Sequence, residues 1–194
     1  DIGFGDNVTP APAEIDYPVM LDQPAPRLKG YPPETVVAEK FEAAVKLGMI
    51  NTRMKDFYDL WLMSRQFDFD GRTLAKAVQA TFAHRGTALT VSPTAFTTSF
   101  YDDAQKRTQW KAFLDRSGLT DAPKSLGDAL DSAKALLVPL AEACIAKRDF
   151  AMRWKAPGPW REWPRTNLQI ILGFVRPNVI RFLAPGIEQN PCRF

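Results

Sequence analysis

The chain has 194 residues, and its 25 lysines and arginines nearly balance its 22 aspartates and glutamates, which gives a formal net charge of +3. A hydrophobic content of 45% supplies a globular core and excludes a disordered chain. The charge is too small and too evenly mixed to identify a dedicated nucleic-acid binder, although a local basic patch remains possible. No apolar run approaches the ~20 residues that span a bilayer, and no leader opens the chain. We therefore expect a cytoplasmic protein without a membrane partner.

Histidine and cysteine usage excludes two further classes of site. The single histidine, His84, and the two distant cysteines, Cys144 and Cys192, have neither zinc-ligand spacing nor the pattern of a disulfide framework. Serine, histidine and aspartate all occur, but none stands in the strand-turn-helix context of a hydrolase nucleophile.

The first 33 residues predict a strand followed by a connector. The opening segment DIGFG has the weak alternation of a short strand. Because it begins with Asp1 rather than methionine, we expect the natural protein to extend further upstream. Residues 7–33 contain seven prolines, which remove backbone donors, so they predict a connector with one short strand at the apolar patch 17–21.

Beyond residue 33, apolar residues recur every three to four positions and predict a series of helices. Asn51 or Thr52 is the expected cap of the second helix and Ser92 that of the fourth, whereas Pro139 predicts a kink or break in the last. The expected helices cover residues 34–48, 53–66, a segment within 67–86 that ends at Gly86 (with Leu74, Val78 and Phe82 inward), a segment from Ser92 to Asp103, 104–118 and 125–148.

These elements predict an α+β protein that is mostly α. We expect residues 1–33 to be the remnant of a core strand with its connector, residues 34–160 a helical domain, and residues 161–194 a poorly ordered tail. Trp61 and Trp110 fit the core, while Trp154 and Trp160 fit a partly packed terminus better than an RNA-stacking platform. The Lys-Arg pairs at 106–107 and 147–148 are expected to be scattered surface charges.

Two charged residues fall on the apolar faces of neighbouring helices. At 100° per residue, Lys40 lies on the shoulder of the stripe formed by Val37, Phe41 and Ala44, and Asp56 lies between Leu60 and Met63. An unpaired buried ion costs several kcal/mol, so each residue requires a partner or a task. Two hypotheses remain open: a structural ion pair, or a pocket in which the ammonium binds phosphate and the carboxylate positions a ligand group or a metal.

Three segments resemble a known family. DIGFGD, YPPETVVAEKFEAAVKLG and NTRMKDFYDLWLM are similar to the second half of the AbiEii/AbiGii-type nucleotidyltransferase toxins, the toxin partners of bacterial abortive-infection (phage defence) systems. The resemblance is carried by AEK followed some 16 residues later by RxKDxYDL, and it extends from Asp1 to about Trp160.

The resemblance implies the helical C-terminal region of a DNA polymerase β-like nucleotidyltransferase. Such a protein would transfer a nucleotide from a nucleoside triphosphate (NTP) to an acceptor such as tRNA, with Mg²⁺, and an antitoxin would come from the same operon. The family's Gly-Ser motif with paired acids is absent, since DFD at 68–70 has no Gly-Ser before it. We therefore expect this chain alone to be inactive and to bind neither Mg²⁺ nor NTP.

Residue by residue, the resemblance assigns catalytic roles to Lys40, which matches the family's EK lysine, and to Asp56, which matches the aspartate of KDxYDL. Asp1 corresponds to a third metal-site carboxylate. Lys40, Arg53 and Asp59 would contact the nucleotide, the last two as weaker matches. Nucleotidyl transfer builds negative charge on phosphate, so Lys40 would supply a cation, while Asp56 would either anchor that lysine or orient the acceptor hydroxyl.

Two alternatives to an enzyme remain open at this point. One is a non-enzymatic helical interaction module in which Lys40 and Asp56 form a structural ion pair. The other is a decayed remnant without activity.

Overall fold

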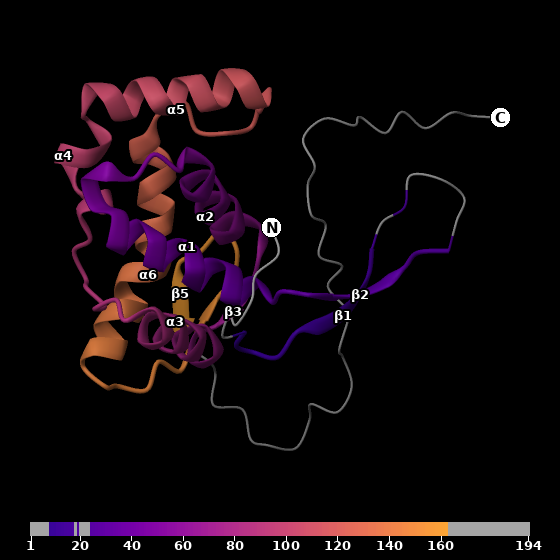
Figure 1. The fold of residues 1–194 in the computed structure, drawn as a ribbon. Helices are drawn as coiled ribbons and strands as arrows, with labels where there is room; N and C mark the ends of the chain where they lie inside the picture. Colours follow the sequence, from indigo (N-terminus) through magenta and orange to yellow (C-terminus); the bar gives the residue numbers. More distant parts are fainter. Residues whose placement is uncertain (1–7, 18, 20–23, 163–194) are drawn as a thin grey trace, which may run out of the picture.

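The computed structural model describes residues 8–17, 19 and 24–162, and in these residues the protein is α+β and mostly helical (Figure 1). The helices are α1 (Pro33–Leu47), α2 (Met54–Gln66), α3 (Gly71–Arg85), α4 (Thr98–Tyr101), α5 (Ala104–Ser117) and α6 (Leu126–Ile145), with two 3₁₀ turns, η1 (Gly48–Ile50) and η2 (Thr94–Phe96). The strands are β1 (Ala13–Asp16), β2 (Arg27–Gly30), β3 (Phe69–Asp70), β4 (Met152–Trp154) and β5 (Trp160–Glu162).

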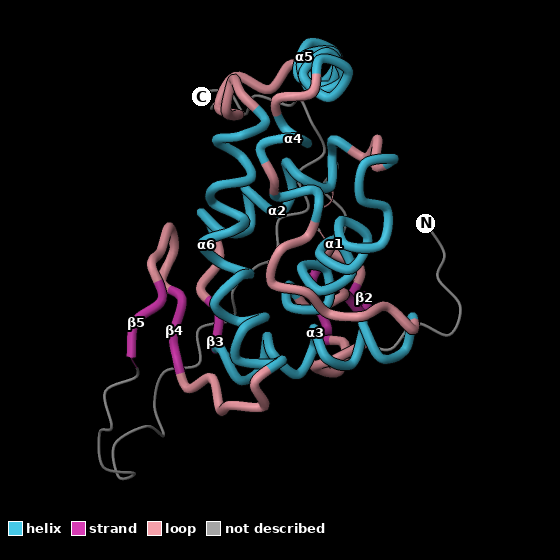
Figure 2. Tube along the Cα trace, turned by 90° about the vertical axis from the view of Figure 1, so that its left-hand side faces the viewer, coloured by secondary structure: helices cyan, strands magenta, loops and turns pink. Residues whose placement is uncertain are grey.

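The helices surround one hydrophobic core. α1 packs against α3 and α2, and α2 packs along α6, while α5 lies across one end of this bundle in both views (Figures 1 and 2). The fully buried side chains at its centre come from every long helix and from α4; they include Phe41, Phe57, Leu74, Phe100, Trp110 and Leu137. The bundle holds α1 and α2 in a fixed relation, which decides the geometry of the candidate site.

The long helices form where local signals place them. Asp70, Asp103 and Ser125 cap α3, α5 and α6 by accepting hydrogen bonds from backbone N–H groups of the first turn. Gly86 and Gly118 end α3 and α5 in the left-handed conformation that glycine adopts without strain. The predictions for these segments are confirmed to within a few residues. The helix that contains Pro139 continues through it, so the expected break is absent.

Two local predictions are wrong. The segment from Ser92 is not one helix but η2 followed by the single turn of α4, because Thr97 has an extended backbone between them and its hydroxyl bonds the carbonyl of Thr94. Asn51 does not cap α2: its side chain accepts a hydrogen bond from the N–H of Arg53, and Arg53 itself occupies the cap position without a side-chain cap. The asparagine orders the loop before α2 instead.

The described part of the proline-rich connector contains two strands, β1 and β2, whereas most of the strand expected at 17–21 lies outside the described residues. β1 pairs with β2 antiparallel, with Ile15 opposite Leu28, and this ribbon extends away from the helices (Figure 1). Both strands occupy proline-free segments, where backbone donors are available for the ladder.

A second sheet, unforeseen in the sequence, joins distant segments. β3 pairs with β4 and β4 with β5, all antiparallel (Figure 2). The indole N–H of Trp154 donates to the Ser64 carbonyl at 2.7 Å and that of Trp160 to the Leu136 carbonyl at 2.9 Å. Trp154 is fully buried rather than partly packed. The sheet therefore fastens the segment after α6 onto α2 and α6.

Several predictions fall outside the described residues: the strand at 1–5, Asp1, Cys192 and nearly all of the tail. The division into residues 1–33, 34–160 and 161–194 stays a prediction. Within the described part of the chain, no helix has the length and apolar character needed to cross a membrane.

Candidate functional site

The candidate site lies between the facing sides of α1 and α2. On α1, Val37, Phe41 and Ala44 are buried in the core, and Lys40 lies at the edge of this stripe. On α2, Leu60 and Met63 are buried, and Asp56 and Asp59 lie on the face turned toward α1. The helical period thus brings a lysine from one helix opposite two aspartates from the next.

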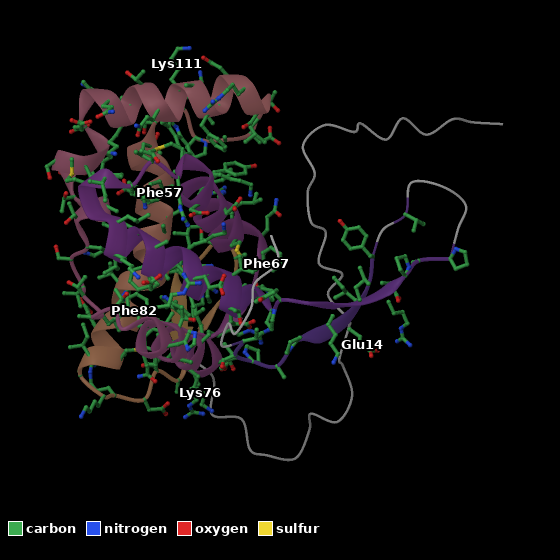
Figure 3. All side chains as sticks on the ribbon, in the orientation of Figure 1. Glu14, Phe57, Phe67, Lys76, Phe82 and Lys111 are labelled. Carbon is green, nitrogen blue, oxygen red and sulfur yellow. The ribbon has the colours of Figure 1, made fainter. Side chains whose placement is uncertain are left out.

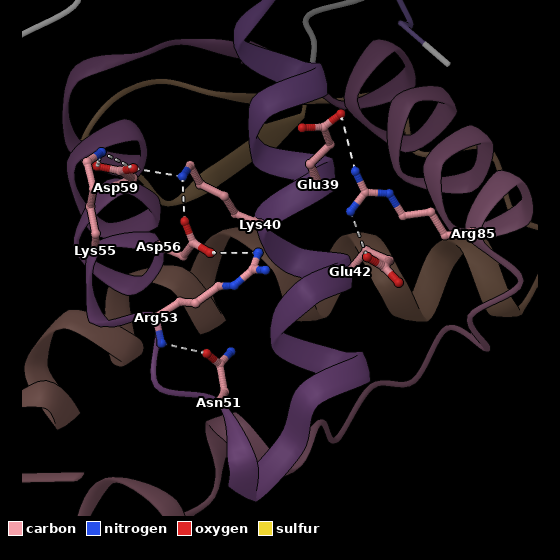
Figure 4. Close-up of polar contacts among 9 residues, drawn as sticks. All are labelled: Glu39, Lys40, Glu42, Asn51, Arg53, Lys55, Asp56, Asp59 and Arg85. Carbon is pink, nitrogen blue, oxygen red and sulfur yellow. Dashed lines mark hydrogen bonds and ion pairs between the residues drawn. The ribbon is translucent and has the colours of Figure 1, made fainter. Parts of the chain in front are cut away.

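Lys40, Asp56 and Asp59 form one cluster, which we call the Lys40 cluster (Figure 4). The Nζ atom of Lys40 lies 2.7 Å from Oδ1 of Asp56 and 2.7 Å from Oδ2 of Asp59. The exposed fractions of the three side chains are only 18%, 18% and 16%. The cluster is therefore neither a surface ion pair nor a fully buried one, and its edge is accessible to a ligand.

The pKa of Lys40 reflects two opposing effects. Burial by itself would lower the pKa of the ammonium, but the carboxylates of Asp59 and Asp56 outweigh burial and raise the pKa above the ordinary value for lysine. Lys40 is therefore a cation throughout the physiological pH range.

Two further cations border the Lys40 cluster. Arg53 Nη1 lies 4.0 Å from Oδ2 of Asp56, and Lys55 Nζ lies 2.7 Å from Oδ2 of Asp59. The side chains of Arg53 and Lys55 are mostly exposed, at 64% and 73%. Three cations against two carboxylates leave these five residues with a net charge of +1, which favours an anionic ligand.

An open groove of about 850 Å³ adjoins Asp56. One wall is the start of α2 with the residues before it, and the other is α5. Residues that line it include Arg53, Lys55 and Asp56 on the first wall and Gln109, Phe113 and Arg116 on the second. Lys40 is not among the lining residues, so Asp56 connects the groove with the Lys40 cluster.

The described residues do not fit a Mg²⁺ site. Asp56 and Asp59 both direct a carboxylate oxygen at one position, but the Lys40 ammonium occupies that position. A divalent cation there would meet this ammonium and would need hard oxygen ligands that lysine cannot provide. No group of three metal-ligating side chains occurs in the part of the chain that the structure describes. Asp1, the expected metal ligand, lies outside that part.

The structure brings together Lys40, Asp56, Asp59 and Arg53, four of the five residues singled out from the sequence. Asp59, a weaker match by motif, lies as close to Lys40 as Asp56 does. The roles of these residues in catalysis stay predictions.

One nearby residue was misjudged. Lys106 is not a surface charge: the residue is 4% exposed, and its Nζ donates to the Asn51 carbonyl at 2.8 Å. The signal was present in the sequence, because Lys106 precedes the core residue Trp110 by four positions and so shares its helical face.

Comparison with known proteins gives one match. Residues 1–133, about two thirds of the chain, match the family described as nucleotidyl transferase AbiEii toxin, type IV TA system. No curated protein and no solved structure matches the chain.

Proposed function

Because the chain belongs to the AbiEii family of nucleotidyl transferase toxins of type IV toxin–antitoxin systems, we propose that its Lys40 cluster is part of a nucleotidyl-transfer site. The substrates would be an NTP and an acceptor such as tRNA. The observation that carries this proposal is the position of the Lys40 ammonium, held by two carboxylates at the edge of a net-positive site.

The geometry fits a lysine that contacts phosphate. An ammonium has three N–H donors, and two of them are directed at Asp56 and Asp59, which leaves one for a phosphate oxygen. The two carboxylates hold the side chain in one orientation, so little conformational entropy is lost when a ligand arrives. Lys40 would then stabilise the negative charge that develops on the phosphates as the acceptor hydroxyl displaces pyrophosphate.

Asp56 is suited to position the acceptor as well as the lysine. Its Oδ1 is nearest to Lys40 and its Oδ2 to Arg53, and the residue lines the groove. A carboxylate shared in this way can accept a hydrogen bond from a hydroxyl that enters by the groove. We assign Asp59 to the orientation of Lys40, because Lys55 holds it on its other side.

We further propose that the 194-residue chain alone does not catalyse transfer. Its sequence contains no Gly-Ser dipeptide before a pair of closely spaced acids, and the Lys40 cluster does not replace such a metal site. The purified chain, incubated with labelled NTP, Mg²⁺ and RNA, should leave the RNA unlabelled. Transfer of label by this chain would refute the proposal.

The second candidate function is an interaction module in which the Lys40 cluster is only a structural ion network. The observation in its favour is the same pair of contacts, since they satisfy both carboxylates. The two functions differ in what a neutral replacement of similar shape should do. Lys40→Met combined with Asp56→Asn and Asp59→Asn removes all three charges of the cluster. Arg53 and Lys55 lose their carboxylate partners but are mostly exposed to water, so folding should be largely retained.

The decisive experiment uses a protein in which this chain follows a segment that carries the family's Gly-Ser and paired acids. A nucleotidyl-transfer site predicts that the triple variant melts close to the parent protein but neither arrests growth nor labels RNA. A purely structural network predicts that growth arrest and labelling persist. Lys46→Met is the matched control, because Lys46 is exposed on the same helix, α1, and should change neither stability nor activity.

The antitoxin of the same operon is part of the proposed context, without a requirement for direct contact. Co-expression with it should relieve growth arrest even when the two proteins do not copurify. This outcome would separate antagonism of the toxin's effect from direct inhibition.

A further inference from the structure

The groove between α2 and α5 adds a third cation, Arg116, to the two that border the Lys40 cluster. Arg53, Lys55 and Arg116 line it, against one carboxylate, that of Asp56. Arg116 donates its Nε–H to the Ala112 carbonyl at 3.1 Å, and no carboxylate partner for it occurs among the described residues. A guanidinium has five donors, so most of those of Arg116 remain for a ligand. The groove therefore favours phosphate groups.

An aromatic side chain forms part of the α5 wall. Phe113 lines the groove and packs against Trp110 and Tyr58, with ring centroids 5.5 and 5.8 Å away. Phe113 is only half-buried and is held in place by these neighbours, so it can offer a firm apolar surface to a nucleobase. Phosphate-binding cations beside an aromatic surface are typical of single-stranded nucleic-acid sites.

A buried hydrogen bond connects the two walls of the groove. The buried ammonium of Lys106, on α5, donates to the Asn51 carbonyl and lies 5.2 Å from the centre of the Phe100 ring. The Asn51 side chain in turn accepts from the N–H of Arg53. Lys106 thus fixes the spacing between α5 and the loop that presents Arg53, which keeps the groove formed in advance of binding.

The position of the groove separates it from the place assigned to the NTP. A phosphate held by Lys40 would contact the cluster on the α1 side of Asp56, whereas the groove is lined by Asp56 and Arg53 but not by Lys40. We propose, resting on the proposed function, that this groove binds the phosphates of the acceptor polynucleotide through Arg53 and Arg116. The strand is thereby led toward Asp56, and Lys106 acts as a positioning residue.

The test is a binding measurement that does not require catalysis. A fluorescein-labelled single-stranded RNA of mixed sequence is titrated with the 194-residue protein and with Arg53→Ala, Arg116→Ala and the double variant. The double variant should bind about tenfold more weakly. The slope of log K against log salt should fall by about 1.4, at roughly 0.7 for each lost phosphate contact on a single strand.

The matched control is Lys111→Ala. Lys111 is on the same helix as Arg116, is 75% exposed and points away from the bundle (Figure 3). This variant removes the same charge from α5 and should bind RNA within twofold of the parent. Melting curves of all variants should coincide, since the altered side chains are exposed.

Three results would overturn the inference: no measurable RNA binding by the parent protein, an unchanged affinity in the double variant, or an equal loss in Lys111→Ala. A labelled NTP titrated in parallel identifies the source of the phosphates, and we expect no NTP binding by this chain alone. NTP binding by the parent that is lost in the double variant while RNA binding is retained would overturn the assignment to the acceptor. RNA binding in the groove together with a neutral Lys40 cluster variant that stays active would refute the proposed function, and with it the role of the RNA as acceptor, while the groove would remain an RNA-binding site.

Discussion

The ion pair of Glu42 provides the sharpest test of how α1 and α3 are held together. Glu42 is on α1 and is 1% exposed, whereas its partner Arg85, at the end of α3, is 30% exposed. Arg85 Nη1 donates to Oε2 of Glu42 at 3.0 Å, and the Thr87 hydroxyl donates to Oε1 at 2.5 Å. Figure 4 shows this contact on the side of α1 opposite the Lys40 cluster. Glu42→Ala would remove both acceptors at once.

We expect Glu42→Ala to reduce the free energy of unfolding by about 3 kcal/mol. Breaking a buried pair costs about 3 to 5 kcal/mol, and the lower end applies because Arg85 can regain water at the surface. For a protein of this size, 1 kcal/mol shifts the Tm by about 2 to 4 °C, so the Tm should fall by roughly 6 to 12 °C.

The measurement is urea unfolding followed by circular dichroism, with Glu39→Ala as the control. Glu39 is on the same helix and pairs with the same arginine at 3.6 Å, but its side chain is 29% exposed. Its loss should cost less than about 1 kcal/mol. A loss below 1 kcal/mol for Glu42→Ala, or equal losses for both variants, would refute the reasoning that burial sets the strength of this contact.

Three further predictions concern pH, thiol reactivity and the second sheet. The pKa of Lys40 is higher in the folded than in the unfolded protein, so its charge stabilises the fold relative to Lys40→Met. This difference in unfolding free energy should be constant below the unfolded pKa of about 10.4 and should disappear as pH rises through the folded pKa. A difference that stays constant in urea titrations up to about pH 11.5 would contradict this prediction. Burial raises the pKa of the Cys144 thiol, so iodoacetamide should label this residue in urea but not in the native protein, as measured by peptide mapping. Rapid labelling of the native protein would show that this face of α6 is accessible. Trp154→Phe removes the indole donor of the Ser64 carbonyl and should lower the free energy of unfolding by about 1 to 3 kcal/mol, measured by thermal unfolding. An unchanged Tm would mean that β4 contributes little to stability.

The sequence was most informative where structure depends on neighbours along the chain. Among the described residues, the apolar period suffices to find five of the six helices, because helix formation relies on contacts three and four residues apart. The same period placed Lys40 and Asp56 on inward faces. The period could not show that Asp59 contacts Lys40 as closely as Asp56 does. Asp59 lies almost a full helical turn beyond Asp56, and only the packing of α2 against α1 brings it to 2.7 Å from Lys40.

The features that remained hidden depend on segments far apart in sequence. β3 pairs with β4 across more than eighty residues, and the groove exists only because α5 lies across the start of α2. The helical period could have placed Lys106 on the inward face of α5, but its partner, the Asn51 carbonyl 55 residues earlier, follows only from the tertiary structure. The amino-acid pattern by itself thus determined where the long helices lie and that Lys40 and Asp56 face inward. Tertiary packing alone decided which of those charges meet and where a ligand can enter, because distances between helices are set by the fit of the whole core.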